Sequence, residues 1–226
     1  MSEIYLVRHA QASYDAEDYD QLSELGYLQS EWLGEYFQQR GIRFNRVLSG
    51  SMKRHKQTAE SALKAMALSA EIEEFPSLNE YDFDSIYRAY QQLSGHQGQG
   101  RKDSKRDFYR VLKKALYAWV DQTLDETLLT ETWEEFQARI NHVIQHVLER
   151  DTGNEKILIV SSGGAIATWA QLVLNAPAAA AVELNLQLRN TNFSHYFYKN
   201  QGIQLSGLNN IPHLDQPERL DTITYA

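Results

Sequence analysis

The chain has 226 residues, of which 42% are hydrophobic and 23% charged, a composition typical of a globular protein. It contains no cysteine, which excludes disulfides, thiolate metal sites and cysteine nucleophiles. The formal net charge of -8 repels polyanions, so we expect no nucleic-acid partner. No apolar run approaches the ~20 residues of a membrane span, and the first residues lack the basic start of a secretory signal. We therefore expect a cytoplasmic protein with no membrane partner.

Hydrophobic periodicity predicts strands that alternate with helices, which indicates an α/β fold. Runs of β-branched and aromatic residues predict the strands, and apolar residues at helical spacing predict the helices. In chain order the sequence predicts a strand over 4–7, a helix over 23–40, a strand over 44–48, a helix after residue 51 that ends near 68, a strand over 71–75, helices over 106–120 and 132–150, a strand over 156–161, a helix over 165–175, and strands over 182–188, 193–198 and 203–207.

The middle of the chain predicts a helical insertion rather than further sheet. Residues 94–106 are rich in glycine and charge, which is typical of a loop, and the helices predicted over 106–120 and 132–150 suggest a helical insertion or cap. The glycines do not form the dinucleotide-binding fingerprint. A basic cluster in this loop admits two interpretations, a lid that recruits anionic substrates or a solvated loop; its members are Arg101, Lys102, Lys105 and Arg106.

Three predicted strands end in short polar turns. Arg8 and His9 follow the first strand, residues 49–54 follow the second, and Ser162-Gly163-Gly164 follow the strand over 156–161. Ligands of α/β sheets bind at the carboxyl ends of strands, so these turns are expected to converge. Arginine donates paired hydrogen bonds to phosphate, a neutral imidazole attacks phosphorus, and a glycine turn before a helix binds anions. The pattern predicts a site for a dianion.

These residues stand in the order of a known family. The segment Leu6-Val7-Arg8-His9-Ala10-Gln11 resembles the leading signature of the histidine phosphatase superfamily, also called phosphoglycerate mutase-like. Later segments are similar to its other motifs: Leu22-Ser23 with Gly26 and Gln29, Ser49 to Glu60, Leu78-Asn79-Glu80, Val160 to Gly164, and Asn190. The resemblance implies a three-layer α/β/α sandwich with a mainly parallel central sheet, as one domain over 1–226 with a helical insertion at about 82–130.

The resemblance also implies roles for single residues. His9 becomes the nucleophile that forms a phosphohistidine, and Glu80 becomes the acid that protonates the leaving group. The implied phosphate-binding residues are Arg8, Arg54, Ser162, Gly163 and Gln11. The implied activity is hydrolysis of a small phosphomonoester, without a cofactor or metal. The sequence does not decide whether the protein forms a homodimer. A mutase activity is disfavoured because extra substrate-binding arginine motifs are not evident in the insertion.

Two positions depart from the family pattern. Ala10 replaces a glycine, which matters only where the backbone needs a positive φ angle. Ser162 stands where the family has its second catalytic histidine, and a neutral, shorter donor is expected to lower the rate on the order of 10²–10³. His55 adjoins Arg54 and is a candidate substitute, but neighbouring helical residues point about 100° apart, which disfavours it.

The sequence also admits a binding scaffold without turnover and a metal site formed by two histidines. A phosphate-binding scaffold that has lost turnover competes with the enzyme, although Glu80 argues against it because binding alone requires no acid. His142 and His146 are four residues apart and suit a metal, but they lie away from the buried stripe of their helix. A solvated helix face explains them better.

Overall fold

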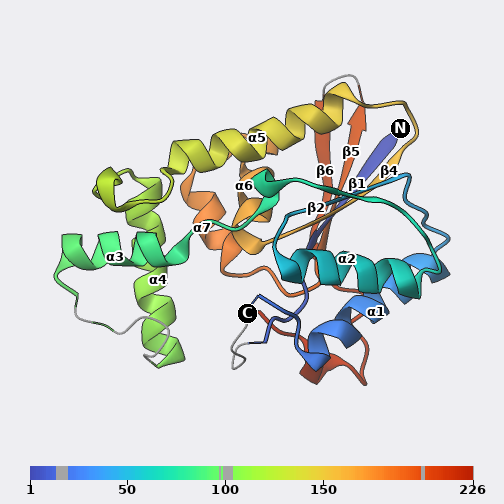
Figure 1. The fold of residues 1–226 in the computed structure, drawn as a ribbon, viewed down its shortest axis with the longest axis horizontal. Coiled ribbons are helices and arrows are strands. Elements are labelled where there is room, and N and C mark those ends of the chain that lie inside the picture. The colour runs from blue at the N-terminus through green and yellow to red at the C-terminus, as the bar shows by residue number, and fades with distance from the viewer. Residues whose placement is uncertain (14–19, 97, 99–103, 200–201, 226) are drawn as a thin grey trace.

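The computed structural model describes residues 1–13, 20–96, 98, 104–199 and 202–225, which form an α/β structure (Figure 1). Its main elements are, in chain order, β1 Ser2–Arg8, α1 Glu24–Gln39, β2 Arg46–Ser49, α2 Lys53–Ala65, β3 Ile72–Glu74, α3 Phe83–Ser94, α4 Lys105–Val120, α5 Trp133–Glu149, β4 Lys156–Ser161, α6 Gly163–Val173, α7 Ala179–Asn185, β5 Phe193–Lys199 and β6 Gly202–Asn210. Short 3₁₀ turns lie at η1 Pro76–Leu78, η3 Glu126–Leu128 and η4 Leu220–Thr222.

The strands of the described residues form one sheet in the order β3-β2-β4-β1-β5-β6. Strands β3, β2, β4 and β1 run parallel, whereas β5 is antiparallel to β1 and β6 is antiparallel to β5. The predicted α/β class with a mainly parallel sheet is confirmed. Because β4 lies between β2 and β1, the carboxyl ends of these three strands meet at one edge of the sheet.

Alternate residues of the central strands pack on opposite faces of the sheet, as the two-residue period of a strand requires. Leu6 of β1 joins the apolar cluster that contains Phe136 of α5 and Trp169 of α6. Val7, the next residue, joins the other cluster with Phe37 of α1. Figure 1 shows α5 across the sheet from α1 and α2, so the sheet is the middle layer of three.

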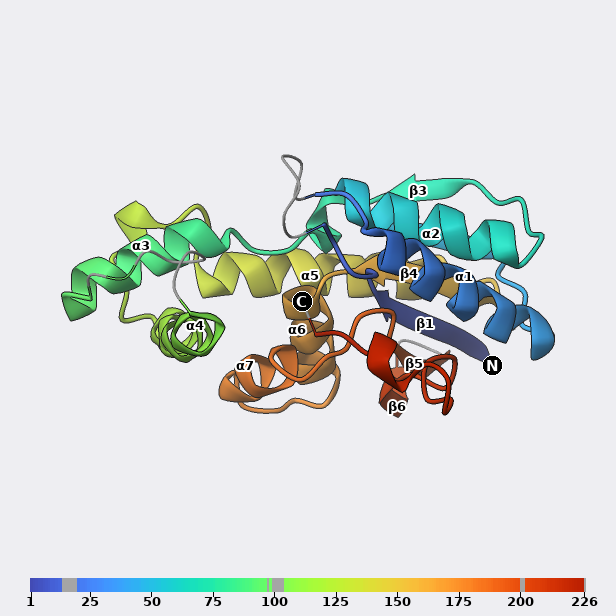
Figure 2. The same ribbon diagram turned by 90° about the horizontal axis from the view of Figure 1, so that it is seen from below.

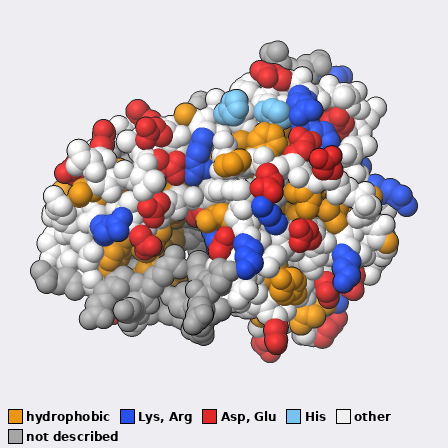
Figure 3. Space-filling view, in the orientation of Figure 1, with side chains coloured by type: hydrophobic (Ala, Val, Ile, Leu, Met, Phe, Trp, Pro, Cys, Tyr) orange, Lys and Arg blue, Asp and Glu red, His pale blue; other side chains and the backbone are white. Residues whose placement is uncertain are grey.

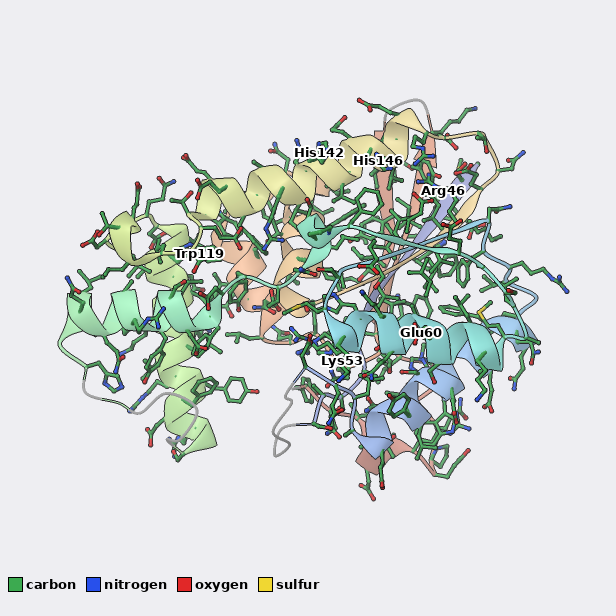
Figure 4. The ribbon with its side chains drawn as sticks, viewed as in Figure 1. Arg46, Lys53, Glu60, Trp119, His142 and His146 are labelled. Carbon is green, nitrogen blue, oxygen red and sulfur yellow. The ribbon has the colours of Figure 1, made fainter. Side chains whose placement is uncertain are left out.

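Helices α3 and α4 occupy the predicted insertion and lie at one end of the molecule, beyond the sheet (Figures 1 and 2). Lys113 of α4 forms an ion pair of 2.8 Å with Glu183 of α7. Trp119, labelled in Figure 4, packs edge-on against Trp133 of α5 with ring centroids 5.2 Å apart. These contacts attach the insertion to α5 and α7.

Two predicted elements differ from the structure. The predicted strand over 182–188 is wrong, because Ala179–Asn185 forms helix α7. The alternation of apolar and polar residues suggested a strand, but the preceding alanines have the highest helix propensity and Pro177 favours a helix start. The predicted loop over 94–106 is shorter, since Ser94 ends α3 and Lys105 begins α4. Arg101 and Lys102 of the basic cluster lie outside the described residues.

Local sequence signals explain where the helices around the sheet begin. The side chain of Ser23 accepts a hydrogen bond from the Gly26 amide and caps α1, and Thr132 with Glu135 forms the predicted capping box of α5. Helix α6 begins at Gly163, two residues before its predicted start. Each helix of the described chain is too short or too polar to span a lipid bilayer.

Candidate active site

The structure brings together the three polar turns that the sequence singled out. Arg8 ends β1 in register with Ser161, the last residue of β4, and Ser49 at the end of β2 pairs with Val160. Backbone bonds continue past the strand ends, because the His9 amide donates to the Ser161 carbonyl at 2.8 Å. The turns after β1, β2 and β4 therefore surround the N-terminus of α6, which begins at Gly163.

His9 is buried at 7% exposure, and its ring is held by its own turn. Its Nδ1 lies 2.8 Å from the Ala10 carbonyl oxygen. A carbonyl only accepts hydrogen bonds, so Nδ1 carries the proton of the neutral ring and Nε2 keeps a free lone pair. Burial, together with the nearby charges of Arg54 and Arg8, holds the pKa of His9 well below its usual range. The ring is thus kept as an unprotonated base.

The turn that carries His9 is fixed by buried side chains. The Ala10 amide donates to the hydroxyl of Thr58 at 3.0 Å, and that hydroxyl donates to the Arg54 carbonyl at 2.7 Å. Asn190 donates to the His9 carbonyl at 3.0 Å. Ala10 is absent from the described non-glycine residues with positive φ, so its replacement of glycine introduces no backbone strain.

The two arginines reach the site from different elements. Arg8 donates through Nη1 to the Leu188 carbonyl and, at 2.6 Å, to the Tyr225 carbonyl, which fixes one edge of its guanidinium group. Arg54, in the first turn of α2, is buried at 7% exposure and donates to Asp20 at 2.6 Å. Its Nη2 lies 3.5 Å from Ser162 Oγ.

Asp20 lies against both Arg54 and the start of α2. Its second carboxylate oxygen accepts a hydrogen bond of 2.8 Å from the Lys53 amide. The Asp20 carboxylate therefore holds a guanidinium edge and a helix N-terminus, two groups that also suit a phosphate.

Glu80 meets the same helix N-terminus from the loop that follows η1. Its Oε2 accepts a hydrogen bond of 3.1 Å from the Gly164 amide. Burial raises the pKa of Glu80, and the Gly164 hydrogen bond with the charges of Arg54 and Arg8 opposes this increase. A Cβ at Gly164 would lie 2.3 Å from the Glu80 carboxylate, so this approach requires glycine. The Glu80 carboxyl therefore keeps its proton to a higher pH than an exposed glutamate does, although two cationic groups lie nearby.

The loop that carries Glu80 is anchored on both sides. The Ser161 hydroxyl donates to the Leu78 carbonyl at 2.6 Å. Arg139 of α5 donates to the carbonyls of Ser77 and Asn79 at 2.8 and 2.7 Å, and it pairs with Glu131 at 2.7 Å. Sequence reasoning did not identify Arg139, because nothing in a helix pattern shows that a polar side chain reaches across to a distant loop.

The other predicted phosphate-binding residues take different positions. Ser162 is fully buried, and its hydroxyl lies 2.6 Å from Nε2 of His55. Gly163 follows it, and a Cβ there would lie 3.5 Å from Nε of Arg8, so the glycine also faces the site. Gln11 is directed toward Ser23, which donates to its side-chain oxygen at 2.8 Å.

His55 lies closer to the site than the rotation between neighbouring helical residues predicts. Its ring is fully buried, and its centroid lies 5.6 Å from that of His9. The 100° rotation between neighbouring helical residues separates His55 from Arg54 at the backbone, but Ser162 Oγ lies within reach of both side chains. One signal was available in the sequence: His55 lies four and seven residues before Ala59 and Ala62, on the stripe of α2 that faces the core.

The pair His142 and His146 lies along α5, away from the site (Figure 4). His142 is exposed, and His146 packs on the ring of Phe75 with centroids 4.8 Å apart. Within the described ranges, no group of three or more histidine, cysteine or acidic side chains is arranged to hold a metal ion.

An apolar cavity adjoins the site on the side of the insertion. It opens beside Gly164 and Tyr81 and extends toward α4, α5 and α7. Its walls are mainly aromatic and aliphatic and include Leu116, Trp119, Trp133, Phe136 and Val182. Tyr81 directly follows Glu80 in the chain, so this wall of the cavity lies next to Glu80. The insertion supplies Leu116 and Trp119 of α4 to the same cavity.

Comparison with solved structures shows the same fold in proteins of low sequence identity. A phosphoglycerate mutase from Bacillus anthracis is 20% identical, with a TM-score of 0.69 over 94% of each chain. A phosphoserine phosphatase from Entamoeba histolytica, solved with phosphoserine, is 16% identical, with a TM-score of 0.63 over 95% of this chain and 100% of its own. A mycobacterial glucosyl-3-phosphoglycerate phosphatase, solved with inorganic phosphate, is 18% identical, with a TM-score of 0.64 over 94% and 99%.

A search of curated protein sequences finds no significant match. The sequence pattern of the histidine phosphatase superfamily (branch 1) matches residues 4–211, which is nearly the whole chain. The family resemblance seen in the motifs is therefore confirmed, and the solved relatives include both phosphatases and a mutase. The chain belongs to the histidine phosphatase superfamily.

Proposed function

We propose that this protein is a phosphatase that hydrolyses a small phosphomonoester through a phosphohistidine on His9. The observation that carries the proposal is the state of the His9 ring, whose Nδ1 faces the Ala10 carbonyl and leaves Nε2 unprotonated. A neutral imidazole between two guanidinium groups suits attack on a phosphate dianion, since the cations bind the phosphoryl oxygens and keep the nucleophile deprotonated.

The proposed reaction has two displacement steps. In the first, His9 Nε2 attacks phosphorus, the bond between phosphorus and the ester oxygen breaks, and Glu80 gives its proton to the departing alkoxide. In the second, Glu80 takes a proton from water, the water oxygen attacks phosphorus, and the bond to His9 breaks to release inorganic phosphate. The raised pKa of Glu80 supports its role, because an acid must hold its proton until the leaving group needs it.

Arg8 and Arg54 bind the phosphoryl oxygens in this proposal, and Gly163 at the start of α6 adds its backbone amide. For Arg54 to do so, the incoming phosphate competes with the Asp20 carboxylate for the guanidinium group. The proposed reaction uses groups of this chain, and we expect it to need no cofactor. The insertion lines the apolar cavity next to Tyr81, and we assign substrate selection to this side of the site.

The test is a panel of phosphomonoesters assayed with the wild-type protein, His9→Ala and a matched control, His142→Ala. His142 is an exposed imidazole on α5, so its removal is expected to leave turnover unchanged. We expect phosphate release by the wild type and the control only, and a phosphoryl group on His9 detected by mass spectrometry after rapid quenching. Equal release by wild type and His9→Ala refutes the proposal.

The second candidate is a phosphate-binding scaffold without turnover. It is favoured by one observation, the neutral Ser162 at the start of α6, where a histidine would donate more strongly to the phosphoryl group. The scaffold predicts that inorganic phosphate binds to the wild-type protein and that no ester in the panel is hydrolysed. Substitution of both Arg8 and Arg54 by Met abolishes phosphate binding under either candidate, so turnover alone separates them.

A further inference from the structure

The pair formed by Ser162 and His55 carries an inference that rests on the proposed function and extends it. The Ser162 hydroxyl is fully buried next to Arg54, and it does not cap α6, although it occupies the capping position. Its contacts are with His55 Nε2 at 2.6 Å and with Arg54 Nη2 at 3.5 Å. A serine at the N-cap position usually accepts a hydrogen bond from a backbone amide of the first helical turn. Ser162 does not, so its hydroxyl is available for other hydrogen bonds.

The position of the ring proton follows from the surroundings of His55. Among the described residues, Nδ1 of His55 is buried and has no hydrogen-bond partner. It faces Gly50, where a Cβ would lie 2.2 Å away. A buried N–H group without an acceptor costs about 1–3 kcal/mol, whereas a bare lone pair against a glycine is tolerated better. The proton of the neutral ring therefore lies on Nε2, which donates to Ser162 Oγ.

Ser162 Oγ then accepts hydrogen bonds from the imidazole and from the guanidinium of Arg54. With two donors directed at its oxygen, the hydroxyl has its own proton left to donate. A phosphate that Arg54 binds would lie next to this hydroxyl, because Arg54 Nη2 is 3.5 Å from Ser162 Oγ. Each donor polarises the next one in a chain of hydrogen bonds, which strengthens the last donor.

We propose that Ser162 is a catalytic residue that donates its hydroxyl proton in a hydrogen bond to a phosphoryl oxygen, and that His55 is the positioning residue that holds and polarises this hydroxyl. The ligand class is the phosphoryl group of the substrate, and the contact strengthens as negative charge develops on its oxygens during transfer. The bond is a hydrogen bond throughout, so no proton leaves Ser162 or His55.

A packing role for His55 is the alternative, and the chain itself contains the control. His213 is also buried, its Nε2 lies 2.9 Å from the hydroxyl of Thr191, and its Nδ1 likewise has no partner among the described residues. It also contacts the ring of Tyr36 of α1. Thermal unfolding of His213→Met therefore measures how much stability is lost when a buried imidazole bonded to a hydroxyl is removed.

The experiment compares His55→Gln with His55→Met. Both side chains are long and unbranched, but only glutamine offers an N–H group near the place of Nε2. We expect His55→Met to lower kcat on the order of 10²-fold with little change in KM, and His55→Gln to restore most of the loss. Ser162→Ala, which removes only the hydroxyl, lowers kcat on the order of 10²–10³-fold. In the Ser162→Ala background the two His55 variants are expected to be equal.

Ligand binding gives a second readout that does not depend on turnover. Vanadate adopts the five-coordinate geometry of the transferring phosphoryl group, so His55→Met and Ser162→Ala are expected to weaken vanadate binding more than phosphate binding. Thermal unfolding of each variant, compared with His213→Met, shows whether the protein is folded. If a folded His55→Met keeps wild-type kcat and vanadate affinity, or if His55→Gln is impaired equally, the pair has a packing role and the inference is wrong.

The failure of this inference differs from the failure of the proposed function. If His9→Ala abolishes turnover while Ser162→Ala does not change it, the protein is a phosphatase without this donor. If no ester is hydrolysed at all, the proposed function fails, and the vanadate comparison still decides whether Ser162 and His55 bind a phosphoryl-like group.

Discussion

At the scale of single residues, the site contains two groups whose pKa values are shifted in opposite directions. Burial and the nearby cations lower the pKa of His9 below 6.5, and burial raises the pKa of Glu80 above 4.5. The proposed first step needs His9 without its proton and Glu80 with it. As pH increases, kcat/KM is therefore expected to rise while His9 loses its proton and to fall while Glu80 loses its own.

Glu80→Gln tests this assignment directly. The amide cannot protonate the leaving group, so kcat is expected to fall on the order of 10²–10⁴-fold. The decrease of kcat/KM at higher pH is expected to disappear, because the group that causes it is gone. A substrate with a good leaving group, such as a nitrophenyl phosphate, is the control, since it needs less protonation and loses less rate. A variant that keeps the wild-type rate and pH profile contradicts the role of Glu80.

The residues of the strand turns could be predicted from the sequence, but their partners could not. His9, Arg8 and Arg54 follow strands or start a helix, and the order of motifs was sufficient to identify them. The contact of His55 with Ser162 depends on the tertiary packing of α2 against β4, which no local pattern describes. A titratable residue on the buried stripe of a helix indicates a buried polar contact, because buried polar groups form hydrogen bonds.

At the scale of elements, α5 supports the active site from outside it. Arg139 joins the loop of Ser77 and Asn79 to Glu131, and its guanidinium packs 4.3 Å from the ring centroid of Phe136. The backbone of Glu80 follows directly on this anchored loop. The helix therefore sets the position of an acid that it does not carry.

Arg139→Met is expected to lower kcat on the order of 10²-fold with little change in KM, because Glu80 loses its alignment while the phosphate-binding arginines stay in place. The measurement is steady-state kinetics with thermal unfolding in parallel. His142→Ala, three residues further along α5 and exposed, is the control on the same helix. A folded Arg139→Met with unchanged kcat shows that η1 holds Glu80 without help from α5.

Helices and strands with strong hydrophobic periodicity were predicted with the correct type. The error at α7 arises because its pattern is short. The central strands and helices α1, α2 and α5 agree with the sequence, because each buries one continuous stripe. Helix α7 was predicted as a strand because it is short, and its alternating residues match a two-residue period equally well. The contact of Glu183 with Lys113 of α4 is a tertiary feature that appears in the structure alone.

At the scale of the whole molecule, charges of both signs are interspersed on the face shown in Figure 3, with histidine side chains at the surface above. The buried histidines have a larger effect on stability. Burial lowers the pKa of His213 to about 3 and holds those of His9 and His55 well below 6.5. In the unfolded chain these rings titrate near 6.5, so below that pH the unfolded state binds more protons than the folded state.

The free energy of unfolding is therefore expected to decrease as pH falls from about 6.5 toward 5, by about 1.4 kcal/mol per pH unit for each buried histidine at the steepest. Glu80 acts in the opposite direction between its unfolded pKa and its raised folded-state pKa, because there the folded state binds the extra proton. Urea unfolding at a series of pH values measures the sum. His213→Met is expected to reduce the slope and His142→Ala to leave it; a flat profile from pH 7 to 5 refutes the account.

The position of β4 has a consequence for the order in which the protein becomes functional. β4 lies between β1 and β2 in the sheet. It pairs with β1 through residues far apart in the sequence, such as Glu3 and Lys156. During synthesis, Arg8, His9 and Arg54 leave the ribosome long before this strand does. Assembly of the catalytic turns must wait for that late insertion, which closes a long loop and slows folding relative to a protein with local pairing. The candidate site is therefore complete only after β4 has joined the sheet.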